Sequence, residues 1–290
     1  MGYRWLRSYG GVNRFGMLRR VERAFAGVPA GTREQRPMFG HTLELDVSRS
    51  NAQQLLYVEG ERFVEERHLL RTLLKPGMTA VDVGANIGYY LLLIEQAVGP
   101  QGRVICIEPS TENLPELQRN IEINRFSNVE LHTVALGDHD GETGLRTGIN
   151  SGVEDVGSAA YTVDLRRLDS LVTERVDFIK IDVEGYEGQV LSGAESMLAN
   201  SRPVMFLELH PQTVGKFGYS IRGILDSLAR HYASIELYEW APDAGKTFTD
   251  KFSERYLGKD PLRMVADRER LVSGCDRGEV QHTFWAVCRA

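Results

Sequence analysis

Short apolar runs alternate with longer amphipathic stretches through most of this chain. The apolar runs predict strands at 79–83, 103–108, 129–136, 177–183, 203–210 and 234–240, and a last one within 282–290. The amphipathic stretches predict helices at 87–98, 111–124, 187–200 and 221–232. Because apolar strands that alternate with helices are typical of βαβ units, this rhythm favours the α/β class, with a mostly parallel sheet covered by helices on both faces.

Three segments do not follow this rhythm. Residues 137–158 are rich in glycine and acids, and their length makes them a candidate lid. Residues 241–281 are polar and predict no element. Residues 28–37 are interpreted as a linker, so we divide the chain into a basic helical extension with its linker at 1–45 and one domain at 46–290.

The first 36 residues carry eight arginines and two acids, which gives them a formal charge of +6 although the whole chain carries −6. Within them, a basic amphipathic helix is predicted from the spacing of Phe15, Leu18, Val21 and Phe25. Two interpretations stay open. The helix packs on its own acidic domain, or it makes a peripheral contact with an acidic membrane surface or a partner.

Composition excludes several classes of protein. A net charge of −6 and a pI near 5.7 argue against a general nucleic-acid binder, which needs a basic field. Cys106, Cys275 and Cys288 form no C-x-x-C pair, so we expect reduced core thiols rather than a disulfide framework or a zinc site. No run approaches the ~20 apolar residues of a membrane span, and no secretory signal precedes the domain, so a cytoplasmic protein is expected.

The stretch VDVGANIGYY at 81–90 combines an apolar strand with a bare loop. Glycines let a backbone approach a ligand closely, and Gly84 and Gly88 follow the strand directly. Their spacing fits neither the dinucleotide fingerprint nor the phosphate-binding loop. A turn without a ligand would not need Asp82 inside the strand. Glu108, at the end of the next strand, can accept both hydroxyls of a ribose, so the pattern predicts a nucleotide-like ligand.

Several blocks in a fixed order carry a resemblance to a known family. VDVGANIGYY, IEPSTENLPELQRNIEIN, VALGD, RLDSL and VDFIKIDVEGYEGQVLSGAESML together resemble the FkbM family of class I S-adenosylmethionine-dependent methyltransferases, over about residues 60–210. The resemblance implies a Rossmann-like, seven-stranded sheet in the order 3-2-1-4-5-7-6, whose strand 7 is antiparallel and corresponds to the run within 282–290.

The resemblance also implies a cofactor site. S-adenosyl-L-methionine would be the cofactor and S-adenosyl-L-homocysteine the product. The methionine end would be surrounded by Asp82, Gly84, Ala85, Asn86 and Gly88. Glu108 would hold the ribose, and the adenine would lie near Ala135 and Leu136, with Asn113 on the ribose or adenine side. Tyr89 and Tyr90 either reach the cofactor or pack in the core.

Polar side chains stand at the ends of two further strands. Lys180 and Asp182 share one face of their strand, and Glu208 and His210 share one face of the next. In the implied sheet order these groups converge with Asp82 at the carboxyl edge. Lys180 is interpreted either as a structural ion-pair partner or as a catalytic residue.

A hydroxyl acceptor benefits from a general base, and His210 has the best unperturbed pKa for that role. Asp182, Glu184 and Glu187 are the alternatives, and a simple hydrogen-bonded strand end is the non-catalytic interpretation of His210. These acids also match the ligands of a divalent metal, but no spacing motif accompanies them, so no metal site is predicted.

The resemblance implies O-methylation of a hydroxyl on a small molecule, natural product or glycan, without naming the acceptor. One alternative is a noncatalytic scaffold that keeps this fold and docks through its basic N-terminus. Another is methylation of a nucleic acid or protein. An acidic chain that lacks a [DNS]-P-P-[YFW] motif disfavours nucleic acid as the partner. The oligomeric state is not predicted.

Overall fold

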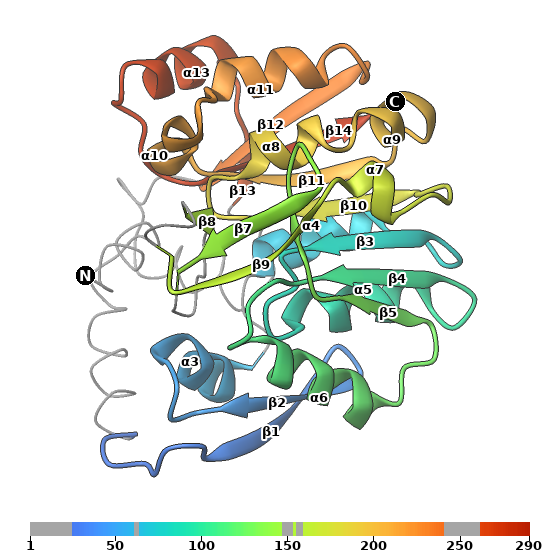
Figure 1. Ribbon diagram of the computed structural model, residues 1–290, viewed down its shortest axis with the longest axis vertical. Helices are drawn as coiled ribbons and strands as arrows, with labels where there is room; N and C mark the ends of the chain where they lie inside the picture. Colours follow the sequence, from blue (N-terminus) through green and yellow to red (C-terminus); the bar gives the residue numbers. More distant parts are fainter. Residues whose placement is uncertain (1–24, 61–63, 147–152, 155–158, 241–261) are drawn as a thin grey trace.

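The computed structural model describes residues 25–60, 64–146, 153–154, 159–240 and 262–290 (Figure 1). The predicted basic helix lies outside the described residues, apart from Phe25. Among the described helices, none is long and apolar enough to cross a bilayer.

An eight-stranded sheet forms the centre of the fold. In spatial order its strands are β13 (Leu262–Met264), β12 (Ser234–Trp240), β14 (Phe284–Arg289), β11 (Val204–Leu209), β10 (Phe178–Ile181), β3 (Thr79–Val83), β4 (Arg103–Ile107) and β5 (Val129–His132). The strands from β11 to β5 are parallel, whereas β14 is antiparallel to both of its neighbours. The α/β class and the order 3-2-1-4-5-7-6 are therefore confirmed, and β13 adds an eighth edge strand that was not predicted.

Helices cover both faces of this sheet, and each face has its own apolar core. One core lies under α7 (Leu168–Leu171), α8 (Glu187–Ser192), α9 (Glu195–Asn200), α11 (Ile221–Leu228) and α13 (Arg268–Asp276). The other lies under α4 (Val64–Leu73) and α5 (Tyr89–Val98). Two shorter elements, α10 (Pro211–Val214) and η1 (Gly215–Phe217), connect β11 to α11. Helix α13 was missed because four of its nine residues are charged and it buries few side chains.

The linker prediction for residues 28–37 was wrong. Strands β1 (Arg33–Met38) and β2 (His41–Asp46) form an antiparallel hairpin, followed by α3 (Asn51–Glu59). The hairpin packs on α6 (Leu114–Asn124), where the Asn120 and Asn124 side chains accept backbone N–H groups of β2 at 2.7 and 2.8 Å. The sequence of β1 resembles a linker because its outward positions are polar, while β2 buries the apolar side chains. The division at residue 45 stays a prediction.

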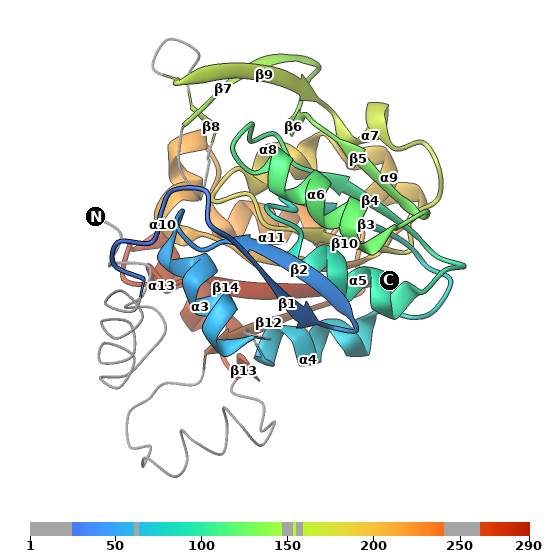
Figure 2. The same ribbon diagram turned by 90° about the horizontal axis from the view of Figure 1, so that it is seen from below.

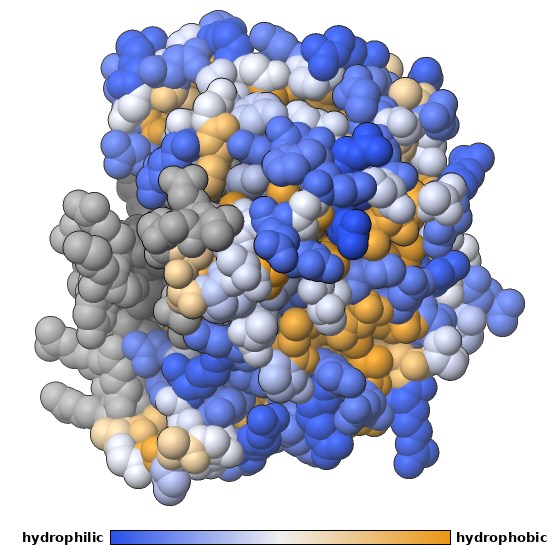
Figure 3. Space-filling model, viewed as in Figure 1, coloured by the Kyte–Doolittle hydropathy of each residue, from blue (hydrophilic) through white to orange (hydrophobic). Residues whose placement is uncertain are grey.

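A second, four-stranded sheet includes two segments of the predicted lid, 141–145 and 153–154, while residues 147–152 and 155–158 lie outside the described residues. Its order is β6 (Ala135–Leu136), β9 (Tyr161–Arg166), β7 (Gly141–Leu145) and β8 (Val153–Glu154). The predicted strand at 129–136 is thus two strands in different sheets. Figure 2 shows β7 and β9 on one side of the main sheet and α4 on the other. Hydrophilic residues cover most of the face seen in Figure 3, with smaller apolar areas between them.

Candidate active site

A pocket of about 640 Å³, its open mouth included, lies at the carboxyl ends of β3, β4 and β10 and reaches the second sheet. Its lining residues are Val83, Gly84, Asn86, Ile107, Glu108, Pro109, Asn113, Val134, Ala135, Leu136, Leu145, Val153, Asp182, Val183, Glu184 and Tyr186. Six of the nine predicted cofactor residues therefore line it, and Asp82, Ala85 and Gly88 do not.

The glycine loop lets β3 and the end of β10 meet closely. Gly84 has a φ of +78°, and a Cβ there would lie 2.0 Å from the Asp182 carbonyl oxygen. Gly88 has a φ of +94°, and α5 starts directly after it. Ala85 is buried behind the loop. Gly84 thus allows Asp182 to lie at the pocket. Gly88 and Ala85 do not contact the pocket and instead help to determine the conformation of the loop.

Glu108 is held rigidly at the pocket although only 4% of it is exposed. Its Oε2 accepts the Asn86 backbone N–H at 2.8 Å, and its Oε1 accepts the Ser110 N–H at 3.0 Å and the Asn113 amide at 3.3 Å. Burial raises the pKa of Glu108, and these hydrogen bonds offset part of that rise. Because Oε2 receives one recorded hydrogen bond, it keeps a lone pair for a ligand hydroxyl.

Asn113 is in turn held from the N-terminal part of the chain. Arg49 donates to the Asn113 Oδ1 at 2.9 Å and to the Glu116 carboxylate at 2.5 Å. Gln53, in the first turn of α3, donates to the other oxygen of Glu116 at 2.9 Å. This network fixes the rotamer of Asn113 and so orients Glu108. Arg49 lies 64 residues from Asn113 in the chain, so no local pattern indicated it.

Asp82 lies in the sheet interior, beside the pocket rather than in it. It is opposite Lys180 in the ladder between β3 and β10, and the Lys180 Nζ lies 3.4 Å from its Oδ1 and 3.8 Å from the Asp182 Oδ2. Lys180 is 1% exposed, and burial lowers its pKa, but the charges of Asp82, Asp182 and Glu208 raise it overall. Lys180 therefore keeps its proton at neutral pH, which favours the ion-pair interpretation.

His210 follows β11 and faces several carboxylates. Its Nδ1 lies 2.7 Å from the Glu187 Oε1, and its Nε2 lies 3.6 to 3.9 Å from oxygens of Glu184, Glu208 and Asp182. Burial lowers the pKa of His210, but the Glu187 hydrogen bond and the surrounding negative charge raise it to about 10. An imidazole in this setting is protonated at neutral pH, so it can act as a base only when positive charge enters the cluster.

Tyr89 and Tyr90 do not line the pocket. Tyr89 packs edge-on against Phe39 with ring centroids 5.2 Å apart. The Tyr90 hydroxyl donates to Glu66, and its ring lies 4.7 Å from the Lys180 Nζ. Burial and the charge of Glu66 raise the pKa of Tyr90 well above its usual range. Both rings therefore serve packing and the buried ion cluster.

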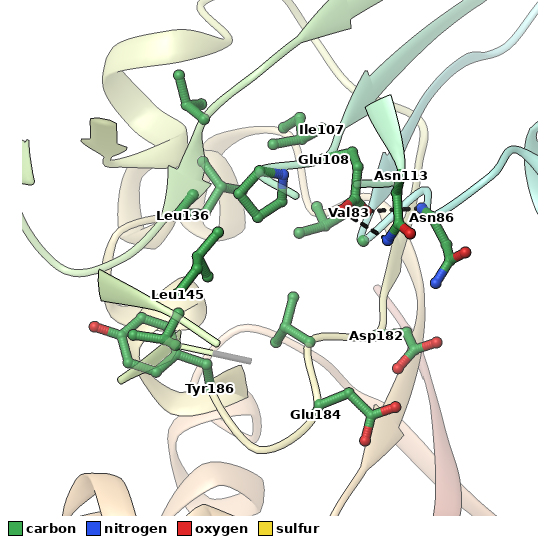
Figure 4. A pocket seen from close by; sticks show the side chains of 16 residues that line it. Val83, Asn86, Ile107, Glu108, Asn113, Leu136, Leu145, Asp182, Glu184 and Tyr186 are labelled. Atoms are coloured by element: carbon green, nitrogen blue, oxygen red, sulfur yellow. Dashed lines mark hydrogen bonds between the residues drawn. The ribbon is translucent and has the colours of Figure 1, made fainter. Parts of the chain in front are cut away.

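Ala135 and Leu136 of the apolar wall were predicted to lie near the adenine, whereas Leu145, Val153 and Tyr186 were not predicted from the sequence. Leu145 and Val153 come from the second sheet, and Tyr186 stands before α8 with its ring against Phe217. Figure 4 shows Leu136, Leu145 and Tyr186 across the cavity from Glu108, Asn86 and Asn113, with the Asp182 and Glu184 carboxylates at its lower edge. Isolated apolar residues within the polar stretch 137–158 were the one signal for this wall.

Comparisons with known proteins show which family the chain resembles. A profile of the Methyltransferase FkbM domain matches residues 82–235, just over half of the chain. The chain is 28% identical to the AMB antimetabolite synthetase AmbE of Pseudomonas aeruginosa, over 71% of this chain and 12% of that protein. It is also 28% identical to Methyltransferase 1 of Beauveria bassiana, over 56% of this chain and 75% of that one.

Among solved structures, the methyltransferase FkbM of Methylobacillus flagellatus aligns with a TM-score of 0.44 and 20% identity, over 67% of this chain and 48% of that one. The matched profile extends from Asp82 in β3 into β12, and so includes β3, β4 and β10, whose carboxyl ends form the pocket. The chain belongs to the FkbM methyltransferase family.

Proposed function

We propose that this protein uses S-adenosyl-L-methionine to methylate a hydroxyl of a small molecule, natural product or glycan. The observation that carries the proposal is the form of the pocket. A fixed carboxylate, Glu108, stands on one side, an apolar wall faces it, and a second group of carboxylates lies at the lower edge. The similarity to a synthetase of an antimetabolite supports a small-molecule acceptor, although the chain spans only 12% of that protein.

The residues present fit this cofactor. Glu108 offers hydrogen-bond acceptors to ribose hydroxyls, and the apolar side chains of Leu136 and Leu145 suit a flat base. Asp182 and Glu184 place negative charge where a cationic group is favoured. When bound, S-adenosyl-L-methionine supplies a methyl carbon attached to a positively charged sulfur.

The chain itself contributes position and proton handling. Alignment of two reactants in a closed site accounts for much of the acceleration in a transfer of this kind, and no covalent intermediate is needed. Glu187, which is fully buried, orients His210 so that Nε2 faces Asp182 and Glu208. Once positive charge enters the cluster and lowers the pKa of His210, this pair of a base and its orienting carboxylate is suited to take the acceptor's hydroxyl proton.

The acceptor class can be tested with S-adenosyl-L-methionine that carries an isotope-labelled methyl group. We expect the purified chain to label the hydroxyl of at least one member of a panel of sugars, phenols and hydroxy acids, as read by mass spectrometry. Label that appears on amines or on added RNA, and on no hydroxyl, would contradict O-methylation.

Arg49→Ala provides a prediction about cofactor affinity. Removing the guanidinium frees the Asn113 side chain and leaves Glu116 buried with Gln53 as its remaining recorded partner. We expect S-adenosyl-L-methionine to bind about five- to tenfold more weakly, because a fixed acceptor becomes mobile. Calorimetry would measure this, with Arg119→Ala as control because Arg119 is half exposed and, among the described residues, forms ion pairs with Glu44 and the exposed Glu122. If Arg49→Ala and the native chain bind S-adenosyl-L-methionine with equal affinity, the network does not support cofactor binding.

A further inference from the structure

Three side chains of different elements meet beyond the lower edge of the pocket. Asp182 follows β10, Glu208 lies in β11, and His210 follows β11. One ligand atom from each lies within 4.8 Å of the other two. The side chains of Asp182 and Glu208 are 26% and 17% exposed, so neither carboxylate is fully buried.

The buried imidazole is oriented toward this point. Glu187, with no exposed side-chain surface, binds the Nδ1 of His210 at 2.7 Å. The Nε2 then lies 3.7 Å from Glu208 and 3.9 Å from Asp182, too far for a hydrogen bond, and none is recorded at Nε2 in the described part of the chain. Metal-binding histidines usually give their other ring nitrogen to a carboxylate in this way.

The charges around this point do not balance. Lys180 lies between Asp82 and Asp182 and is 0.4 Å closer to Asp82, at 3.4 against 3.8 Å. Among the described residues, Glu208 has one recorded ion-pair partner, the distant His210 Nε2. Lys180 and the protonated His210 together face the five carboxylates of Asp82, Asp182, Glu184, Glu187 and Glu208, and partly buried carboxylates in such an excess favour a bound cation.

We propose that Asp182, Glu208 and His210 bind a divalent first-row cation such as Mn²⁺, which displaces the Nε2 proton of His210 to water. Ligands that each lie about 2.1 Å from an ion are about 3 to 4 Å apart, and the observed spacing fits this with small movements. One imidazole and two carboxylates leave coordination positions open.

The catalytic consequence rests on the proposed function. An acceptor hydroxyl that binds the cation at an open position has a lowered pKa, and its proton passes to water. The resulting oxygen then forms the new O–C bond as the C–S bond of the donor breaks. The cation would also hold the acceptor at the edge of the cofactor pocket, because Asp182 belongs to both sites.

The test is a titration of the metal-free full chain with Mn²⁺, followed by electron paramagnetic resonance of the free ion, without any cofactor. We expect one Mn²⁺ per chain, and at least about tenfold weaker binding in Asp182→Asn and Glu208→Gln. Glu195→Gln is the matched control, since Glu195 also stands beside a histidine, His231, at 3.2 Å but is exposed. Thermal unfolding of the metal-free variants checks that each one folds.

The outcomes separate this inference from the proposed function. Affinity for Mn²⁺ that is unchanged in Asp182→Asn and Glu208→Gln, or reduced equally in Glu195→Gln, would overturn the site. So would the absence of stoichiometric binding in a chain that still binds S-adenosyl-L-methionine by calorimetry. Mn²⁺ binding without cofactor binding would support the site and contradict the proposed function.

Discussion

Glu108→Ala is expected to weaken S-adenosyl-L-methionine binding by about 100-fold, or roughly 3 kcal/mol. The substitution removes the acceptors proposed for the ribose hydroxyls. It also leaves the Asn86 and Ser110 N–H groups without the partners that fix the loop. Calorimetric titration of the variant against the native chain measures the change directly.

Two further variants make this result specific. Glu108→Gln keeps the size of the side chain and one acceptor, so we expect an intermediate affinity. Glu122→Ala removes an exposed acid of α6, 57% exposed at its side chain, and should bind as the native chain does. A folded Glu108→Ala variant with native affinity would show that this carboxylate does not hold the cofactor.

His210→Ala is expected to lower turnover by about 10² to 10⁴-fold, while affinity for S-adenosyl-L-methionine changes no more than about threefold. The reason is location: His210 lies in the acidic cluster and does not line the pocket. The loss is expected whether His210 takes the proton itself or holds a cation, and the Mn²⁺ titration distinguishes the two. Turnover is measured with an acceptor identified in the isotope-label panel.

His231→Ala is the matched control, because His231 also pairs with a glutamate, Glu195, at 3.2 Å, and neither residue lines the pocket. It should leave turnover unchanged. If His210→Ala and Glu108→Ala lose cofactor affinity to the same extent, the two roles are misassigned.

The elements that position the site were predictable because their signals are local. Each parallel strand is an apolar run with a polar residue at its end, and Glu108 and Asp182 are found by that rule alone. Asp82 does not line the pocket because successive side chains of a strand point to opposite faces of the sheet. It stands on the face of β3 opposite Val83, which lines the pocket, and its neighbour across the ladder is Lys180.

Other parts of the site depend on contacts that no local pattern carries. The hairpin of β1 and β2 resembles a linker, because its hydrogen-bond partners, Asn120 and Asn124 of α6, lie 76 and 82 residues away in the chain. The apolar wall includes Leu145, which becomes a pocket residue only through pairing of β7 with β9. The orientation of His210 depends on Glu187, which is 23 residues away. All three features therefore depend on contacts between residues that are far apart in the chain.

The central claim is that the pocket bounded by Glu108 and Asp182 binds S-adenosyl-L-methionine, and calorimetry on the purified native chain tests it most directly. The account predicts one site per chain, with micromolar or tighter affinity for both S-adenosyl-L-methionine and S-adenosyl-L-homocysteine. A folded chain that binds neither compound at high micromolar concentration would contradict the account and favour a noncatalytic scaffold with this fold.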